Sequence, residues 1–192
     1  MVKSFKSEII IEIPEDISLN IKDMMVTIEG KKGKITKDFS HVKKVEILYQ
    51  DNKVTLTSYF PRKSTEAKLG TLRSIIQNAI DGVTKGYTYK MKIAYAHFPI
   101  TVDIDKNRIL IKNFIGERSP RITFKAGTHP IEIKASKEDV VISGIDKEEV
   151  GQTAANIQKT CRIRKKDKRI FQDGIYVFEK YLGEELLWKI KV

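Results

Sequence analysis

Cysteine is almost absent from this sequence, whose 192 residues include only Cys161. A single cysteine excludes a disulfide bond within the chain. The three histidines, His41, His97 and His129, are scattered, and none has the i,i+4 spacing or the cysteine partners typical of a metal site. We therefore expect neither a metal ion nor another cofactor.

Long hydrophobic runs are also missing. The run Ile9-Ile10-Ile11 is bounded by Glu8 and Glu12 and is too short for the core of a signal peptide. No stretch approaches the roughly 20 apolar residues of a membrane-spanning helix. We expect a soluble, cytoplasmic protein with no membrane partner.

No set of residues in the sequence suggests catalysis. In residues 30–36 two residues separate the glycines, instead of the four of a phosphate-binding loop, so a basic hairpin turn explains this segment better. Cys161 has no histidine nearby in the sequence to act as its base. Glu148 and Glu149 fit the first turn of a helix, where the helix dipole favours negative charge. We expect no enzyme activity and no small-molecule substrate.

Positive charge is what the chain has in excess. It carries 36 Lys and Arg against 25 Asp and Glu, a formal net charge of +11 with a sequence pI near 9.6. Such an excess says nothing about the fold, but it favours a polyanionic partner. Composition alone leaves RNA, DNA and an anionic membrane surface as candidates. A membrane surface is the weakest of these, because neither predicted helix pairs a broad apolar face with a uniformly basic one.

The first half of the chain shows strand patterns followed by a helix pattern. Four segments alternate apolar and polar residues and predict strands: 17–21, 26–28, 45–47 and 54–56. A tight hairpin turn is expected between Gly30 and Gly33. After Pro61, apolar residues recur at helical spacings of three and four: Leu69, Leu72, Ile75, Ile76, Ala79 and Ile80.

The second half repeats this plan. Residues 100–104 and 109–111 correspond to 17–21 and 26–28 at an offset of 83, and the same offset matches Gly116 with Gly33. Residues 131–133 and 140–142 correspond to 45–47 and 54–56 at an offset of 86, and a helix with Val150, Ala154 and Ile157 on its apolar side follows. Constant offsets indicate a duplication.

The fold class predicted from this duplication is α+β. We expect two tandem homologous units, each a small antiparallel sheet packed against one helix. The predicted boundaries are residues 1–84 for the first unit, 85–182 for the second and 183–192 for a C-terminal tail. The tail carries Trp188 and apolar neighbours, which suggest docking on its own unit or on another protein.

One segment, residues 159–169, is densely basic, and we call it the basic strip. Asp167 is its single acid, and its cations are Lys159, Arg162, Arg164, Lys165, Lys166, Lys168 and Arg169. Clustered cations of this kind are typical of phosphate binding, although an exposed loop that happens to be basic is the alternative. A smaller cluster on the hairpin turn has less weight, because lysines commonly occupy exposed turns: Lys31, Lys32 and Lys34.

Several motifs, in order along the chain, resemble the universal large-subunit ribosomal protein family number six. The strongest is Val150-Gly-Gln-Thr-Ala-Ala-Asn-Ile157. Residues 82–91 and 95–100 look like the eukaryotic branch of the family, where the protein is traditionally called large-subunit protein nine, and residues 113–117 and 173–176 add to the family match. The resemblance extends from about Ile9 to Lys180.

The resemblance implies a structural constituent of the large ribosomal subunit that supports translation. Members bind large-subunit ribosomal RNA, chiefly through the second unit, near the sarcin–ricin loop and the stalk base. In that family the helix with Gly151 and Gln152, and the loop after it, face RNA. Where bacterial members have Pro-Tyr-Lys-Gly-Lys-Gly, this chain has Arg164-Lys-Lys-Asp-Lys-Arg169, so individual contacts do not transfer.

The partners implied are this RNA and neighbouring ribosomal proteins, without DNA. Localisation would be cytoplasmic, and nucleolar during assembly if the organism is eukaryotic. The main alternative is a free-standing RNA-binding protein or RNA chaperone with the same fold. An RNA-processing enzyme that uses the basic strip to hold its substrate is a weaker one, because no catalytic set accompanies the strip.

Overall fold

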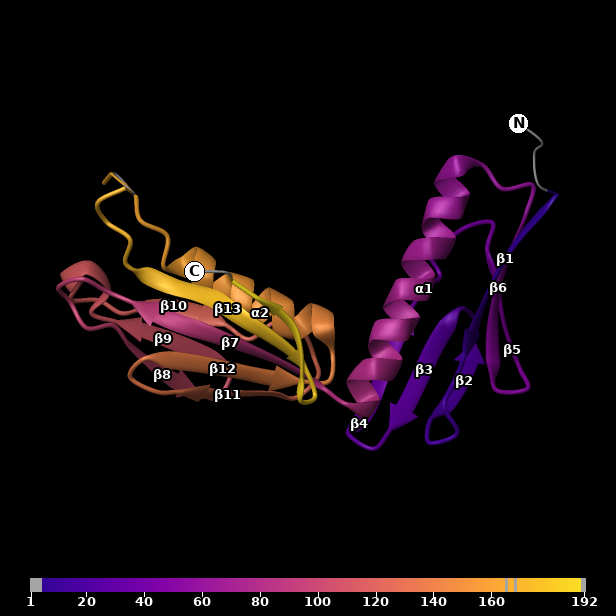
Figure 1. Ribbon diagram of the computed structural model, residues 1–192, viewed down its shortest axis with the longest axis horizontal. Helices are drawn as coiled ribbons and strands as arrows, with labels where there is room; N and C mark the ends of the chain where they lie inside the picture. The colour runs from indigo at the N-terminus through magenta and orange to yellow at the C-terminus, as the bar shows by residue number, and fades with distance from the viewer. Residues whose placement is uncertain (1–4, 165, 168, 191–192) are drawn as a thin grey trace. The chain divides into compact units, whose positions relative to one another are not determined.

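The computed structural model describes residues 5–164, 166–167 and 169–190. Contacts divide the chain into two compact units, the first ending at Thr84 and the second beginning at Lys85. Figure 1 shows one long helix in each unit, packed beside antiparallel strands. Neither helix, among the described residues, is long and apolar enough to cross a membrane.

The first unit contains six strands and a helix. They are β1 (Lys6–Glu12), β2 (Ser18–Lys22), β3 (Met25–Gly30), β4 (Gly33–Asp38), β5 (Glu46–Gln50), β6 (Lys53–Tyr59) and α1 (Lys63–Thr84). The strands form two sheets, in the orders β1-β6-β5 and β2-β3-β4, and α1 packs on strands of both. The buried face of α1 includes the predicted apolar residues Leu69, Leu72, Ile76, Ala79 and Ile80.

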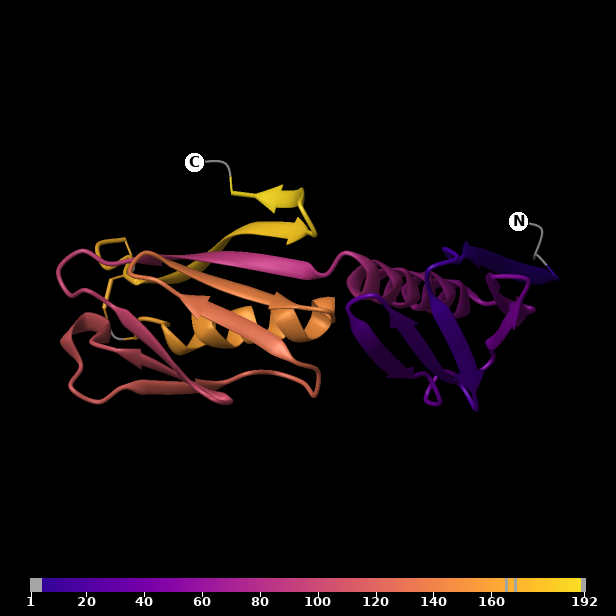
Figure 2. The same cartoon turned by 90° about the horizontal axis from the view of Figure 1, so that it is seen from below.

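The second unit repeats these elements and adds two strands. They are β7 (Tyr87–Ala94), β8 (Thr101–Asp105), β9 (Arg108–Lys112), the 3-10 turn η1 (Phe114–Gly116), β10 (Arg121–Phe124), β11 (Ile131–Ala135), β12 (Asp139–Gly144), α2 (Lys147–Thr160), β13 (Gly174–Leu182) and β14 (Glu185–Lys189). The sheet orders are β10-β9-β8 and β11-β12-β7-β13-β14. Figure 2 shows α2 lying along the strands of this unit.

The pairing register confirms the duplication and the α+β class. Ser18 pairs with Glu29 between β2 and β3, and Thr101 pairs with Lys112 between β8 and β9, so both partners shift by 83 positions. In the same way, the β5–β6 register recurs between β11 and β12 at an offset of 86. The prediction of one small sheet per unit needs a refinement, because the strands of each unit form two separate sheets.

The change of offset from 83 to 86 has a physical location. Ile28 pairs with Ile35, whereas its equivalent Ile111 pairs with Arg121, so the offset is already 86 on β10. The connection between β9 and β10 therefore holds the extra residues, and it contains η1. The expected match of Gly116 with Gly33 was wrong, because Gly116 ends η1 while Gly33 begins β4.

The C-terminal segment is part of the second unit's sheet. Strand β14 pairs antiparallel with β13, which pairs with β7. Gly183, with a φ of 58°, makes the turn between β13 and β14, and its N–H donates to the carbonyl of Gly86 at 2.8 Å. Of the two alternatives for the tail, docking on its own unit is what the structure shows.

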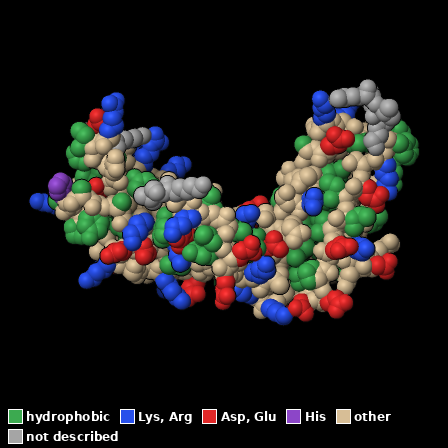
Figure 3. Space-filling view, viewed as in Figure 1, with side chains coloured by type: hydrophobic (Ala, Val, Ile, Leu, Met, Phe, Trp, Pro, Cys, Tyr) green, Lys and Arg blue, Asp and Glu red, His purple; other side chains and the backbone are tan. Residues whose placement is uncertain are grey.

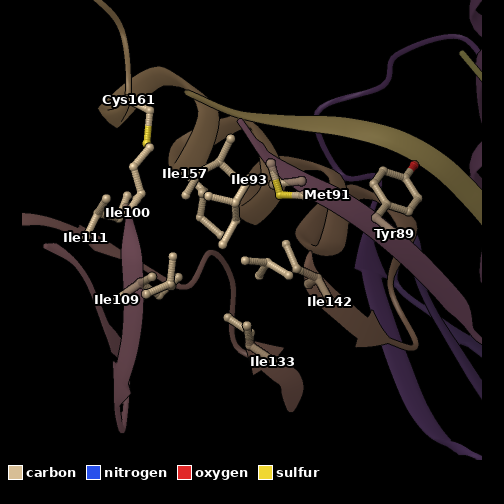
Figure 4. Close-up of a cluster of buried hydrophobic side chains, with 14 of the residues drawn as sticks. Tyr89, Met91, Ile93, Ile100, Ile109, Ile111, Ile133, Ile142, Ile157 and Cys161 are labelled. Carbon is tan, nitrogen blue, oxygen red and sulfur yellow. The ribbon is translucent and has the colours of Figure 1, made fainter. Parts of the chain in front are cut away.

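The core of the second unit lies between its sheets and α2. Figure 4 shows the buried side chains as one cluster that extends from Cys161 at one end to Tyr89 at the other. Met91, Ile142 and Ile157 in this cluster are fully buried. Truncating such a side chain to alanine costs about 2–5 kcal/mol, since part of the cavity remains open.

Candidate nucleic-acid interface

Helix α2 buries one face and leaves a nearly neutral face exposed. Asp146 caps its N-terminus by accepting the N–H of Glu148 at 2.9 Å, which satisfies one of the helix's free donors. The buried positions are Val150, Thr153, Ala154 and Ile157. Between the exposed Glu148 and Lys159 at its two ends, the outward positions carry small or amide side chains: Gly151, Gln152, Ala155 and Gln158.

Gly151 and Gln152, both predicted as RNA-binding, lie on this outer face. A Cβ atom at Gly151 would lie 3.7 Å from the ring of Tyr89, an ordinary contact, so packing does not require glycine there. The side-chain amide of Gln152 donates to Asn156 at 2.9 Å. Glycine at position 151 and the lack of charged side chains in the middle of this face let a sugar-phosphate backbone approach the helix closely.

The C-terminal end of α2 is held by an arginine from β10. Nη1 of Arg121 donates to the carbonyls of Thr160 at 2.7 Å and Arg162 at 3.2 Å. The same guanidinium binds both carboxylate oxygens of Glu117, at 2.8 and 2.6 Å, and its carbon lies 4.3 Å from the centroid of the Phe114 ring. The hydrogen bonds with Arg121 lower the pKa of the Glu117 carboxyl and raise that of Arg121.

Beyond α2 the basic strip alternates buried and exposed side chains. Cys161 and Ile163 are buried in the core, whereas Arg162, which lies between them, and Arg164, which follows, are exposed. Burial raises the pKa of the Cys161 thiol to about 12, so the sulfur stays protonated and is no nucleophile near neutral pH. The apolar residues anchor the segment, and both arginines consequently face solvent.

Asp167, the one acid of the basic strip, accepts backbone N–H groups from residues that follow it. The Asp167 side chain accepts the N–H of Arg169 at 2.9 Å, and its backbone carbonyl accepts that of Phe171 at 2.9 Å. The ammonium of Lys166 lies 4.6 Å from the centroid of the Phe171 ring. The Arg169 side chain is 93% exposed, and its nearest described acid is 4.0 Å away.

The structure brings several predicted cations together. Lys159, Arg162 and Arg164 line one shallow groove with Arg121. Figure 3 shows blue Lys and Arg side chains on the part of the second unit where Figure 1 draws the connection from α2 to β13. Lys165 and Lys168, also predicted, lie outside the described residues.

The smaller lysine cluster lies on the β3–β4 turn, as predicted, in the first unit. Lys31 forms an ion pair with Asp16 at 2.5 Å. The backbone N–H of Lys32 donates to the carbonyl of Val83 at 3.0 Å, which fixes the turn against the end of α1. Part of the positive charge of this turn is therefore already neutralised within the unit.

Three residues with metal-binding side chains meet at the start of α2. Ligand atoms of His129, Asp146 and Glu149 lie within 4.8 Å of one another. The Glu149 carboxylate, however, accepts the N–H groups of Thr128 and His129, at 2.9 and 3.1 Å, and contacts His129 Nδ1 at 2.9 Å. These contacts attach the β10–β11 loop to α2, which is a structural role that the sequence pattern did not reveal.

Comparisons with known proteins match almost the whole chain. A family model described as "Ribosomal protein L6" matches residues 1–86 and 98–174. The "Large ribosomal subunit protein uL6" of Methanosphaera stadtmanae is 47% identical over 180 residues, which are 94% of this chain and 97% of the relative. The protein of that name from Staphylothermus marinus is 45% identical over 177 residues, 91% of this chain and 94% of the relative. These relatives are archaeal, so this likeness is not confined to the eukaryotic branch.

Proposed function

Because the chain belongs to the ribosomal protein L6 family, we propose that its second unit holds large-subunit ribosomal RNA through α2 and the basic strip. The protein is a structural, non-enzymatic constituent of the large ribosomal subunit and supports translation. Its location is accordingly the ribosome.

The observation that carries this proposal is the geometry of the basic strip. Cys161 and Ile163 are anchored in the core, and Arg121 fixes the backbone carbonyls beside them. Arg162 and Arg164 are thereby presented on a braced segment rather than on a loose loop. Phosphate contacts from such ordered cations cost less side-chain and backbone entropy on binding.

The proposal gives the two units different roles. The second unit combines the basic strip with the neutral outer face of α2, which suits close approach of an RNA backbone. The first unit carries the turn with Lys31, whose charge is paired with Asp16. We assign the main RNA contact to the second unit and a bracing role to the first. The family resemblance favours a position near the sarcin–ricin loop and stalk base, beside other ribosomal proteins.

The test is the salt dependence of RNA binding by the full chain. Replacing Arg164, Lys166 and Arg169 with glutamine should weaken binding to a large-subunit RNA fragment. The slope of log K against log salt should flatten by about one unit for each phosphate that the variant no longer binds. A matched control replaces three exposed cations of α1, Lys63, Lys68 and Arg73. An unchanged slope for the first variant, or an equal loss of affinity in the control, contradicts the assignment to the basic strip.

A further inference from the structure

One row of side chains crosses all five strands of the second unit's larger sheet. Successive register pairs join Ile133 to Ile142, Ile142 to Tyr89, Tyr89 to Lys180 and Lys180 to Trp188. The first three residues are buried in the core of the unit, whereas Trp188 remains 44% exposed. The sheet therefore extends beyond the helix that covers it, and its last two strands leave part of this face open.

The open part of this face forms a groove beside α2. Its floor contains Tyr89, Lys180 and Trp188, and its wall on α2 contains Gly151, Ala155 and Gln158. The ammonium of Lys180 lies 5.2 Å from the centroid of the Tyr89 ring and 5.1 Å from that of the Trp188 ring. Figure 4 shows the Tyr89 hydroxyl pointing away from the buried cluster.

The platform for Trp188 is fixed from the opposite face of the sheet. The Glu179 carboxylate accepts the Tyr181 hydroxyl at 2.7 Å and contacts the Lys189 ammonium at 3.0 Å and that of Lys90 at 3.6 Å. These contacts tie β14 to β13 and β7. The backbone that carries Trp188 is therefore already fixed, which lowers the entropy lost when a ligand binds.

The chemistry of the groove suits one kind of occupant. A partly exposed indole offers a stacking surface for any nucleobase. The Gln158 amide offers both a donor and an acceptor, as the edge of a base requires. The Lys180 ammonium supplies charge complementary to phosphate, whereas an apolar peptide would leave this cation without an anion.

We propose that this groove binds one unpaired RNA nucleotide, with its base stacked on Trp188, its edge facing Gln158 and its phosphate near Lys180. None of the strip's cations lines this groove, although a neighbouring hollow that shares Ala155, Gln158, Tyr176 and Ile190 with it is lined by Lys159 and Arg162. The inference rests on the proposed function, since the nucleotide would come from the ribosomal RNA held by α2 and the strip.

Trp188 is the only tryptophan of the chain, so intrinsic fluorescence reports directly on the groove. Titration of the full chain with a single-stranded RNA hexamer should quench this fluorescence saturably. An abasic oligonucleotide of the same length and inorganic phosphate should leave the fluorescence unchanged. Quenching by the abasic oligonucleotide as strong as by the hexamer overturns the proposal.

The fluorescence anisotropy of a labelled RNA hexamer measures the affinity of variants of the groove. Trp188→Ala should weaken binding about tenfold, because stacking on an aromatic ring is lost. Trp188→Phe, which keeps a ring, should retain most of the affinity, and Leu187→Ala, an exposed neighbour on β14, should change nothing. Equal affinity of Trp188→Ala and the parent for the hexamer overturns the proposal. If Trp188→Ala keeps its RNA affinity but no longer associates with the large subunit, the proposal is also overturned, because the groove then binds a protein partner.

The outcome is distinguishable from failure of the proposed function. The variant that neutralises Arg164, Lys166 and Arg169 should still show quenching of Trp188 at saturating RNA. If RNA does not quench Trp188 in the parent, but the strip variant shows the expected flatter salt slope, the groove is rejected and the strip is kept. If the strip variant and the parent have equal salt slopes and Trp188 is still quenched, the strip is rejected and the groove is kept.

Discussion

The guanidinium of Arg121 donates a 2.7 Å hydrogen bond to the backbone carbonyl of Thr160, the last residue of α2 and 39 positions further along the chain. The last carbonyls of a helix have no partners within it, and a cation there also complements the helix dipole. Arg121 therefore ends α2 and sets the direction in which the basic strip leaves it. This relationship gives the first prediction.

Replacing Arg121 with methionine should destabilise the second unit by about 2 kcal/mol, because hydrogen bonds from a charged donor to two carbonyls are removed. It should also weaken RNA binding, since Arg162 and Arg164 lose their braced position. Urea unfolding and RNA anisotropy measure the two effects. Arg118→Met, at an exposed position in the connection that precedes β10, is the control and should leave both unchanged. Full RNA affinity in the Arg121 variant would show that the strip needs no brace.

Gly151→Ala should separate stability from binding. Glycine within a helix costs about 0.5–1 kcal/mol relative to alanine, and the added Cβ finds an ordinary contact with Tyr89 at 3.7 Å. The variant should therefore be more stable in urea. It should bind RNA more weakly, because the added methyl group keeps the RNA backbone further from α2. Gly70→Ala in α1, where no atom lies within 4 Å of the new Cβ, is the control. It should raise the stability in urea and leave the RNA affinity unchanged. Unchanged RNA binding by Gly151→Ala contradicts an RNA-facing glycine.

The lysines of the β3–β4 turn should matter less than the basic strip. Replacing Lys31, Lys32 and Lys34 with glutamine should flatten the salt slope by less than one unit, compared with about one unit for each phosphate bound by the strip. The reason is that Lys31 already neutralises Asp16. RNA binding measured at several salt concentrations compares this variant with the variant of the basic strip. A larger change for the turn than for the strip would reverse the proposed roles of the two units.

The Glu179 cluster should make the β13–β14 hairpin sensitive to acid. The hydrogen bond from Tyr181, followed by that from Lys189, lowers the pKa of the Glu179 carboxyl. A carboxyl with a lowered folded-state pKa stabilises the fold fully above the pKa of the unfolded chain, about 4.3, and this contribution is lost as the pH falls through the folded-state value.

Urea unfolding followed by Trp188 fluorescence tests this pH dependence. The parent should be more stable than Glu179→Gln at pH 7, and the difference should shrink as the pH falls below about 4.3. Glu184→Gln, at an exposed position in the β13–β14 turn, is the control and should follow the parent. A stability difference that is constant with pH would show that the carboxylate charge does not hold the hairpin.

Local patterns predicted the duplicated strands and helices because alternation and helical spacing are properties of neighbouring residues. The constant offsets then placed equivalent pairs such as Ser18–Glu29 and Thr101–Lys112 in one register. The η1 insertion was missed, since Gly116 imitates Gly33 in sequence spacing alone. Only strand pairing distinguishes the two glycines.

The candidate site was predictable only where charge is clustered in the sequence. The basic strip stands out as a run, and its exposed arginines follow from the alternation with Cys161 and Ile163. Arg121 lacks any such local signal, because its importance depends on hydrogen bonds with residues 39 and 41 positions away. Trp188 and Tyr89 likewise share a groove only after β7, β13 and β14 have paired.

The order of strands in the two units has a consequence for the protein outside the ribosome. In the second unit, β13 pairs with the edge of β7, whereas the equivalent strand β1 remains at the edge of its sheet. An edge strand offers unpaired backbone groups to another chain, and charged side chains reduce this tendency. Lys6, Glu8 and Glu12 on β1 supply such charges. In the second unit the C-terminal hairpin moves the open edge of the sheet from β7 to β14, which carries the exposed side chains Leu186, Leu187 and Trp188. Before assembly, self-association of the free protein should accordingly begin at β14 rather than at the charged edge β1.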